Sequence, residues 1–410
     1  MNCSPMKDTP QVQNKIQASQ LQKIILSEAL KNRYALAMWQ LPNDTVQHCI
    51  LDFSGKPHRI RVDLEECVPG FVVSPFVSSD KENAFFVRAD FQIDFQGGQC
   101  LHQETADPRS GEFYQNLLKH PFENLYFARD WRRYFKKSIH HTSTTQSHYE
   151  NLVKKGIEEI QNGRFIKVVL SRTKSLEYKE SLDLIDFFQK LSENYSTAFR
   201  YLFHIPEVGT WMGASPEILI SVDQNQIFRT VALAGTQALQ AHKKLSEVAW
   251  TQKEIEEQAI VGRYIINCFK KIRLREFDEE GPKTIIAGNL MHLCTRFLVD
   301  MQAANFPQLG TVMLDLLHPT SAVCGMPKDP ALDFILKHEG HDREFYSGFL
   351  GPVNIHRESH IFVNLRCMQF LEDRMLLYAG AGVTEDSNPS KEWNETEMKC
   401  ETLNRVLTTL

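Results

Sequence analysis

Cysteines are scattered through this chain without any pattern that would pair them. The nine cysteines form no CxxC motif and no regular spacing, and their number is odd. Disulfide-stapled secreted domains and zinc ribbons usually show such patterns. We therefore expect reduced thiols and a cytoplasmic location.

Long apolar runs and an excess of basic charge are missing as well. No stretch approaches the roughly 18 apolar residues of a membrane-spanning helix. The segment 1–20 lacks the apolar core of a signal peptide. The net charge of −5 gives no reason to expect nucleic acid as a partner. We expect neither a membrane nor a nucleic acid among the partners.

Several ligand-binding motifs are absent or incomplete. No GxxxxGK[ST] stretch occurs, and AGAG at 379–382 lacks the third glycine of a dinucleotide fingerprint. The stretch 386–397 has the length of an EF-hand loop, but Lys391 occupies the position of its essential glycine. KHEGHD at 337–342 lacks the HExxH spacing of a zinc site and is more typical of a polar loop.

What the chain does contain is a mixture of strands and helices. Its 42% hydrophobic and 24% charged residues are ordinary for a globular protein, and 410 residues can bury a large core. Strand-like runs dominate residues 34–96, and long helices are expected at 245–273 and 389–408. Because strands cluster rather than alternate with helices, the sequence predicts an α+β fold with extended antiparallel sheets.

A polar segment at 140–150 marks a soft boundary. Ser147, with Glu150 three residues later, has the spacing of a helix-capping box. We expect residues 1–145 to form an N-terminal α+β part of the same fold and residues 146–410 to form the region that carries the function.

A lysine in an apolar strand is the first candidate for a catalytic residue. In RFIKVVLSR the period of two places Lys167 between Phe165 and Val169 on one face, while the other face is also apolar. A buried lysine loses part of its proton affinity, which suits a general base. The alternative is a lysine that guards an edge strand against aggregation. The sequence alone leaves both open.

The segment WMGASPEILISV offers a carboxyl partner for that base. Its small residues let the backbone approach a ligand closely, and Glu217 leads into the apolar run ILISV. A carboxyl in an apolar setting has a raised pKa and can hold a proton for a leaving group. The alternative is an exposed glutamate in a turn. As base and acid, Lys167 and Glu217 would suit the transfer of a hydroxyl group between carbons.

The last expected helix carries a charged row at the border of its apolar face. Glu392, Glu395 and Lys399 share one face, behind a glycine-rich loop, and Asn388 followed by proline provides a typical helix start. A second acidic cluster occurs in TQKEIEEQ at 251–258. Both clusters fit a solvated helix surface, and they also fit a site for a metal and an anion.

Seven motifs in these regions, taken in order, resemble those of the chorismate-utilising enzymes, most closely isochorismate synthases. The motifs are IKVVLSR (166–172), GASPE (213–217), LAGT (233–236), LHPTSAVCG (317–325), REFYSGFLG (343–351), LYAGAGV (377–383) and EWNETEMK (392–399). They span about three-fifths of the chain. The resemblance implies a large α+β fold of the anthranilate synthase component I type, with antiparallel sheets and helices outside, around one site in the region 146–410.

By motif position, the resemblance also implies a reaction. Lys167 would activate water for attack at C2 of chorismate, and Glu217 would protonate the departing C4 hydroxyl, in an Mg²⁺-dependent isomerisation to isochorismate. Glu257, Glu392 and Glu395 would hold the Mg²⁺, with Glu392 acting directly or through water. The implied substrate-binding residues are Gly213, Ala214, Ser215, Gly235, Thr236, His318, Tyr346, Arg366, Gly380 and Lys399.

The lysine separates this chain from relatives that use ammonia. Anthranilate synthases carry glutamine at position 167, and aminodeoxychorismate synthases with a covalent lysine carry it where this chain has Ala234. No glutamine amidotransferase subunit is therefore expected. Salicylate synthase shares the lysine and is the nearest rival, and a non-catalytic chorismate-binding protein is a further alternative. Menaquinone and catecholate siderophore synthesis both remain open as the pathway.

Some positions depart from the motifs of the family. Gln258 stands where histidine usually follows the first metal ligand, so the choice between Glu256 and Glu257 rests on spacing and stays open. Ser321 replaces a common proline, and Glu344 replaces a usual glycine. None of these departures touches the expected base or acid.

Overall fold

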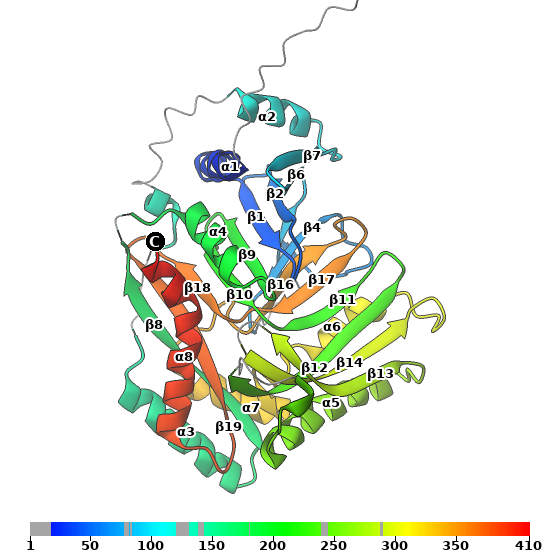
Figure 1. Ribbon diagram of the computed structural model, residues 1–410, viewed down its shortest axis with the longest axis vertical. Coiled ribbons are helices and arrows are strands. Elements are labelled where there is room, and N and C mark those ends of the chain that lie inside the picture. Colours follow the sequence, from blue (N-terminus) through cyan, green and yellow to red (C-terminus); the bar gives the residue numbers. More distant parts are fainter. Residues whose placement is uncertain are drawn as a thin grey trace, which may run out of the picture.

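Two large β-sheets form the centre of the computed structural model (Figure 1). The structure describes residues 18–77, 82, 84–119, 131–137, 143–179, 181–238, 245–287 and 290–410. The first sheet has ten strands, in the spatial order β15 (Gly325–Met326), β8 (Lys167–Glu177), β19 (Arg374–Val383), β18 (Cys367–Phe370), β10 (Gly209–Ser215), β9 (Phe199–Ile205), β1 (Ala35–Gln40), β2 (Gln47–Asp52), β6 (Phe91–Gln96) and β7 (Gln99–Gln103). The second has nine, in the order β13 (Asp278–Ala287), β14 (Leu290–Asp300), β12 (Ile227–Ala238), β11 (Ile218–Val222), β17 (Ser359–Val363), β16 (Phe349–Val353), β4 (Gly70–Ser74), β5 (Ala84–Arg88) and β3 (His58–Ile60).

The two sheets pack against each other through large aromatic side chains. Trp39, Phe199 and Trp211 of the first sheet belong to one buried cluster with Phe71 and Phe362 of the second. The rings of Phe199 and Phe362 stack with their centroids 4.1 Å apart. Because aromatic side chains bury large apolar areas, this layer holds the sheets face to face.

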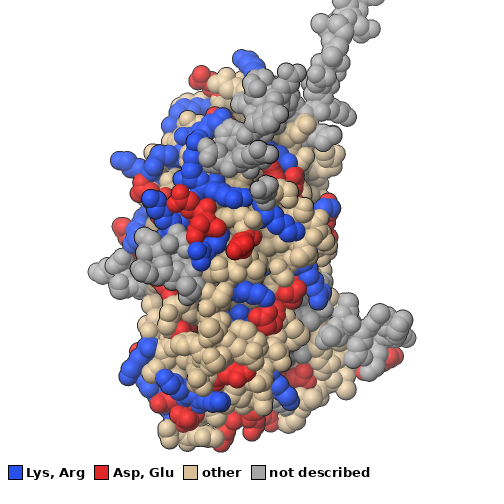
Figure 2. All heavy atoms as spheres, turned by 90° about the vertical axis from the view of Figure 1, so that its left-hand side faces the viewer, with Lys and Arg blue, Asp and Glu red and all other residues tan. Residues whose placement is uncertain are grey.

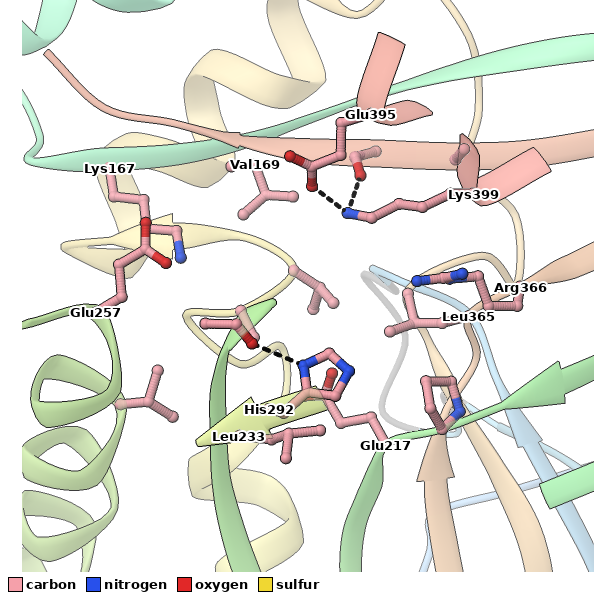
Figure 3. Close-up of a pocket in the computed structure, with 18 of the residues that line it drawn as sticks. Lys167, Val169, Glu217, Leu233, Glu257, His292, Leu365, Arg366, Glu395 and Lys399 are labelled. Atoms are coloured by element: carbon pink, nitrogen blue, oxygen red, sulfur yellow. Dashed lines mark hydrogen bonds and ion pairs between the residues drawn. The ribbon is translucent and has the colours of Figure 1, made fainter. Parts of the chain in front are cut away.

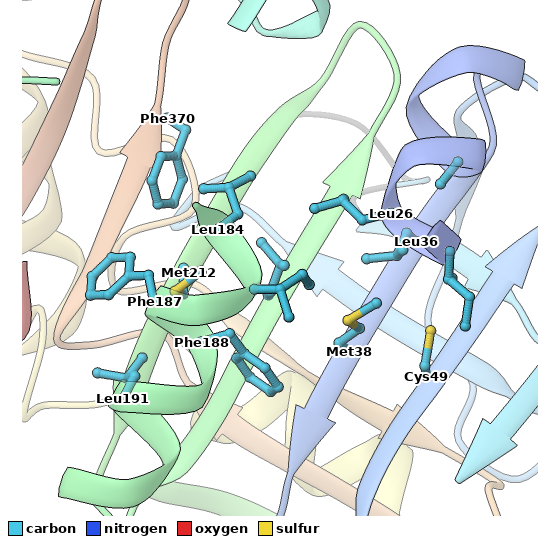
Figure 4. Close-up of a cluster of buried hydrophobic side chains, with 14 of the residues drawn as sticks. Leu26, Leu36, Met38, Cys49, Leu184, Phe187, Phe188, Leu191, Met212 and Phe370 are labelled. Carbon is cyan, nitrogen blue, oxygen red and sulfur yellow. The ribbon is translucent and has the colours of Figure 1, made fainter. Parts of the chain in front are cut away.

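Helices cover the outer faces of this sandwich. They are α1 (Ala18–Asn32), α2 (Arg109–Leu118), α3 (Gln146–Gln161), α4 (Leu184–Asn194), α5 (Gln252–Lys271), α6 (Leu309–Leu317), α7 (Lys328–His338) and α8 (Pro389–Thr408), with short 3₁₀ helices η3 (Trp131–Tyr134) and η4 (Leu245–Glu247). Helices α1, α4 and α8 pack on the first sheet, and α5 and α6 pack on the second. In Figure 4, Phe187 and Phe188 of α4 lie against Met212 of β10. The prediction of antiparallel sheets with helices outside is confirmed, since every described strand pair is antiparallel.

Helix α8 begins where its sequence signals predict. The side chain of Asn388 accepts a hydrogen bond from the backbone N–H of Lys391, and Pro389 is the first helical residue. Thr396, Cys400 and other residues of the apolar stripe are buried against the first sheet. A cap that satisfies a free N–H and a proline that needs none together define this start.

Two other helix starts differ from the prediction. Helix α3 is capped by Thr145, which accepts from the N–H of His148 at 3.3 Å, so Ser147 lies inside the first turn and is not the cap. Helix α5 begins at Gln252 rather than at 245, because Thr251 and Glu254 form a capping box there. In both cases a competing threonine satisfies the first backbone donors of the helix.

Both parts of the chain contribute strands to each sheet. Strand β1 pairs with β9 in the first sheet, and β4 pairs with β16 in the second. The expected boundary at 145 therefore falls between strands that share the same two sheets. On the face shown in Figure 2, acidic and basic side chains are interspersed. None of the helices in the described segments combines the length and apolar character needed to cross a membrane.

Candidate active site

One cavity gathers most of the side chains that the sequence singles out (Figure 3). It has a volume of about 400 Å³ and lies where β8, α5 and α8 approach the connection between β10 and β11. Ten of the expected site residues line it, namely Lys167, Glu217, Gly235, Glu257, Tyr346, Arg366, Gly380, Glu392, Glu395 and Lys399. The fold therefore brings together residues that lie more than 200 positions apart in the chain.

Lys167 is the first residue of β8 and reaches into the cavity beside Glu257 (Figure 3). Met326 of β15 pairs with it, so it does not guard an open sheet edge. Burial lowers the pKa of Lys167, the charge of Lys399 adds to this effect, and Glu257 and Glu217 oppose it. A lysine that faces a cavity with a lowered pKa can serve as a proton acceptor.

Glu217 lies at the point where the chain crosses from one sheet to the other. It follows Ser215, the last residue of β10, and precedes Ile218, the first residue of β11. Burial raises the pKa of Glu217 to about 7, although Lys167 and Lys399 pull it down. This carboxyl therefore retains a substantial protonated fraction at neutral pH, which suits a general acid.

Three carboxylates line the cavity at the positions expected for metal ligands. Glu257 comes from α5, and Glu392 and Glu395 come from α8. Burial alone would raise the pKa of Glu395, but Lys399, with its Nζ 2.7 Å from the Glu395 Oε1, and Arg366 outweigh that effect and lower it. Glu395 is therefore ionised at neutral pH.

These carboxylates do not meet in one tight group. In the part of the chain that the structure describes, these three glutamates do not form a group in which one carboxylate oxygen from each lies within 4.8 Å of the other two. The expected Mg²⁺ shell of Glu257, Glu392 and Glu395, with Glu392 acting directly or through water, stays a prediction, and in these side-chain positions Glu395 pairs with Lys399. Of the two open choices on α5, Glu257 lines the cavity, while Glu256 is exposed and accepts from Gln252.

Two cationic side chains enter the cavity from the same side (Figure 3). Lys399 donates to the carbonyl of Gly380 at 2.8 Å, and the Nη1 of Arg366 donates to the Thr402 hydroxyl at 3.0 Å. A Cβ at position 380 would lie 2.8 Å from the Tyr346 hydroxyl oxygen, so glycine keeps this wall open. An ammonium and a guanidinium fixed side by side suit a ligand with carboxylate groups.

The residues Gly213, Ala214 and Ser215 lie behind the cavity wall and do not line it. The N–H of Ala214 donates to the carbonyl of Arg366 at 3.1 Å, and the Ser215 hydroxyl donates to the carbonyl of Val363. A Cβ at Gly213 would come within 2.9 Å of the ring of Tyr201. Their small size therefore serves close packing of β10, and the expected direct contact with a ligand does not follow from this geometry.

His318 also lies outside the cavity. Its Nε2 is 3.1 Å from the carbonyl oxygen of Phe76, and its ring contacts Phe349 edge-on. Burial lowers the pKa of His318 to about 4, so it is neutral and donates to that carbonyl. The side chain of Thr236 lies outside the described residues, whereas Gly235 beside it lines the cavity.

Two further cavity residues, His292 and Glu254, were not among the expected site residues, although Glu254 belongs to the acidic cluster at 251–258. The Nδ1 of His292 lies 2.7 Å from the carbonyl oxygen of Gly235, and burial lowers the pKa of this histidine to about 4. Because a carbonyl only accepts, Nδ1 carries the proton. Glu254 also lines the cavity, but its carboxylate accepts from the N–H of Thr251 and caps α5. A histidine inside an apolar strand pattern was the available signal for His292.

The KHEGHD segment supports the site from behind rather than binding metal. Glu339 is buried and accepts from the N–H of Ser171 on β8 at 2.7 Å. It also pairs with Arg343, whose guanidinium donates to the carbonyl of Val169 at 2.7 Å. This buried network anchors the strand that begins with Lys167, so the segment is more than the polar loop that the sequence predicts.

A family model for chorismate binding enzymes matches residues 83–408. Because the match covers most of the sequence, the chain belongs to the family of chorismate binding enzymes. This confirms the resemblance carried by the seven motifs.

Individual relatives carry names that are more specific than the family description. The chain is 29% identical over 270 residues to the isochorismate synthase DhbC of Bacillus subtilis, an alignment that covers 63% of this chain and 67% of the relative. It is 30% identical over 268 residues to the isochorismate synthase EntC of Escherichia coli K12, covering 64% of this chain and 67% of the relative.

Solved structures share the architecture. MenF, the menaquinone-specific isochorismate synthase from Escherichia coli, matches with a TM-score of 0.73 at 21% identity, covering 93% of this chain and 91% of its own. Anthranilate synthase component I from Streptococcus pneumoniae TIGR4 matches with a TM-score of 0.64 at 21% identity, covering 84% and 77%. The expected fold of the anthranilate synthase component I type is therefore confirmed.

Proposed function

We propose that the protein is an isochorismate synthase, which converts chorismate to isochorismate. The observation that carries this proposal is the pairing of Lys167 and Glu217 in one cavity, with pKa values displaced in opposite directions towards neutrality. Such a pair supplies a base and an acid at the same pH. The isochorismate synthases among the relatives support the choice of reaction.

In the proposed reaction, Lys167 accepts a proton from a water molecule as the water oxygen bonds to C2 of chorismate. The ring double bonds shift, and the bond between C4 and its hydroxyl oxygen breaks. Glu217 donates its proton to that oxygen, so one water enters and one leaves. Lys167 and Glu217 lie on different walls of the cavity, which leaves room for the ring between them (Figure 3).

Arg366 and Lys399 would bind the two carboxylates of the substrate. Both cations lie on one side of the cavity, and their hydrogen bonds to Thr402 and to the Gly380 carbonyl hold them in place. A guanidinium can bind a carboxylate through two parallel hydrogen bonds. This clamp would hold the ring in register with the base and the acid.

Mg²⁺ is part of the proposal, and Glu257, Glu392 and Glu395 would hold it. Carboxylates are the donors that this hard cation prefers, and ligands that are not gathered tightly suit an ion that keeps several of its own waters. When bound, the ion would offset the negative charge that these glutamates place against an anionic substrate.

Product analysis tests this function directly. The purified protein is incubated with chorismate and Mg²⁺, and the products are separated by chromatography and identified by NMR. Isochorismate is the expected product, and its formation should stop with EDTA and resume with added Mg²⁺. Salicylate fluorescence without a partner enzyme would assign the protein to salicylate synthases, and chorismate binding without turnover would assign it to non-catalytic relatives.

The same proposal has consequences for the partner subunits, the cellular location and the pathway of the protein. Water as the nucleophile needs no glutamine amidotransferase subunit, and the eight cysteines of the described residues are all free, as in a reducing cytoplasm. The isochorismate would enter either menaquinone or catecholate siderophore synthesis. Deleting the gene and measuring menaquinone and secreted catechols decides between these pathways.

A further inference from the structure

A second group of side chains with metal-binding atoms lies away from the candidate active site. His48 on β2, Asp94 on β6 and His356 in the connection between β16 and β17 place nitrogen and oxygen atoms within 4.8 Å of one another. The His48 Nδ1 is 2.7 Å from the Asp94 Oδ1, and the His356 Nε2 is 3.4 Å from the Asp94 Oδ2. No other such group of three occurs among the described residues.

Strand register holds two of these side chains together. Trp39, His48 and Asp94 are successive cross-strand partners on β1, β2 and β6, so they form one row across the first sheet. The Trp39 ring stacks on the His48 ring with centroids 5.2 Å apart. The side chains of His48 and Asp94 are only 9% and 7% exposed. The imidazole and the carboxylate are thus fixed before any ligand arrives.

The third side chain comes from the opposite sheet. The turn that carries His356 is held by Asn354, whose amide donates to the carbonyls of Leu64 and Cys67 at 2.9 and 2.7 Å. The His356 side chain is 51% exposed, which leaves the group accessible from solvent. One ligand set therefore spans both sheets.

A cavity of about 300 Å³ adjoins this group. It is lined by all three residues and also by Asp44, Glu358 and His360, and none of its lining residues belongs to the candidate active site. This cavity has room for a water molecule or a small anion next to the three side chains.

We propose that His48, Asp94 and His356 bind a divalent cation of the zinc type. Two imidazole nitrogens and one carboxylate oxygen form a donor set that suits Zn²⁺, Co²⁺ or Ni²⁺ and does not suit Mg²⁺. Three protein ligands would leave at least one coordination position for a further ligand, and the adjoining cavity has room for it. The bound ion connects β2 and β6 of the first sheet to the β16–β17 turn of the second.

A hydrogen-bonded network without metal is the competing explanation for the same geometry. Gln103 donates to the Asp94 Oδ2 at 3.0 Å, so this carboxylate has partners on both oxygens. Such a network would hold the side chains in place but would not bind Zn²⁺ tightly. The two explanations therefore predict different affinities for Zn²⁺, and a binding measurement separates them without an assay of catalytic activity.

Calorimetric titration of the full-length protein with ZnCl₂, in the presence of saturating Mg²⁺, separates them. The wild-type protein should bind one Zn²⁺ at this site, and His356→Ala should weaken that binding by at least about tenfold. His356 is half exposed, so its replacement leaves the core intact, whereas Asp94→Asn removes a buried carboxylate and serves as a second variant. Co²⁺ bound to the same protein should show visible absorption bands that His356→Ala loses.

His360→Ala is the matched control, because His360 lines the same cavity but pairs with Glu358 at 3.1 Å. It should retain the Zn²⁺ affinity of the wild type. Zn²⁺ should also raise the melting temperature of the wild-type protein and of His360→Ala, but not that of His356→Ala. Absence of Zn²⁺ binding to the wild type, equal binding to His356→Ala, or an equal loss in His360→Ala would overturn the proposal.

Discussion

Two lysines reach the same cavity from different elements, and their surroundings differ in kind. On α8, Lys399 is held by the Glu395 carboxylate at 2.7 Å and by the Gly380 carbonyl at 2.8 Å. At the start of β8, Lys167 has a lowered pKa whose leading causes are burial and nearby charges, with no hydrogen bond among them. Partners that stabilise an ammonium keep it charged for binding, whereas burial without such partners prepares it to lose a proton.

Removing the unpaired lysine should have the largest effect. Lys167→Ala should lower kcat by up to about 10⁴-fold, the upper end of what a general base contributes, while chorismate binding changes little. Steady-state kinetics and calorimetric titration with chorismate measure the two quantities separately. Lys174→Ala, on the same strand but paired with Glu397 at 2.7 Å, is the control and should keep its kcat. A parallel loss of binding in Lys167→Ala would assign this lysine to the same role as Lys399.

Replacing Glu217, the proposed acid, should have the next largest effect on kcat. The titration of Glu217 should also shape the pH dependence of kcat/KM. The reactive pair holds one proton, on Glu217 and not on Lys167, so kcat/KM should be bell-shaped, low where both groups are protonated and low where neither is. Glu217→Gln should lower kcat by about 10²–10³-fold and should abolish the alkaline decline, because glutamine has no proton to lose. A wild-type profile that is flat from about pH 6 to 9 would contradict this acid–base pair, since the pKa of Glu217 is raised to about 7.

Replacing the paired lysine should affect binding more than turnover. Lys399→Met should raise KM by about 10–100-fold, the size expected for a lost hydrogen bond to a charged group, and kcat should fall much less. Lys399→Arg retains the charge and should recover part of the affinity. Lys391→Met, at an exposed position of the same helix, is the control and should match the wild type. A change in kcat alone would contradict the distinction between the two lysines.

The acidic partner of Lys399 should control the requirement for metal. Glu395→Gln should raise the Mg²⁺ concentration needed for half-maximal activity by at least about tenfold, because one charged ligand becomes neutral. Glu401→Gln, on the same helix and facing Arg405, provides the comparison. An unchanged Mg²⁺ dependence would remove Glu395 from the metal site and leave it only as the partner of Lys399.

The smallest effect is expected from a substitution at Gly382, which lies next to the side chain of Lys167. A Cβ at position 382 would lie 3.0 Å from the Cε of Lys167, a flexible side chain that can shift by a few tenths of an ångström. Gly382→Ala should therefore lower kcat by only about two- to tenfold without changing KM, well below the loss caused by a displacement of 1 Å. Gly262→Ala, where nothing lies within 4 Å of the added Cβ, should leave kcat unchanged.

Much of the fold and several site positions could be predicted from local patterns. Asn388 followed by proline predicts the start of α8, and the β-branched residues of RFIKVVLSR predict the strand that carries Lys167. These signals are local because helix caps and β-branched runs depend only on near neighbours in the sequence. The choice of Glu257 over Glu256 was not predictable in this way, since it depends on which face of α5 meets the second sheet.

Other features depend on contacts between distant segments. Gly213 and Ser215 are small because β10 packs closely against Tyr201 and Val363, and sequence alone cannot distinguish such packing from access for a ligand. Likewise, His48 and His356 lie over 300 positions apart and obey no spacing rule. Only strand pairing and the meeting of two sheets bring them together.

The crossing of the chain at Glu217 has a consequence for how this protein acquires activity. The base belongs to one layer, the acid sits on the bridge between layers, and α5 and α8 bring their glutamates from opposite outer surfaces. A refolding intermediate in which only one of the two sheets has formed would contain only some of these catalytic and metal-binding side chains. Recovery of turnover after denaturation should therefore report the late docking of the two layers, later than the regain of circular dichroism.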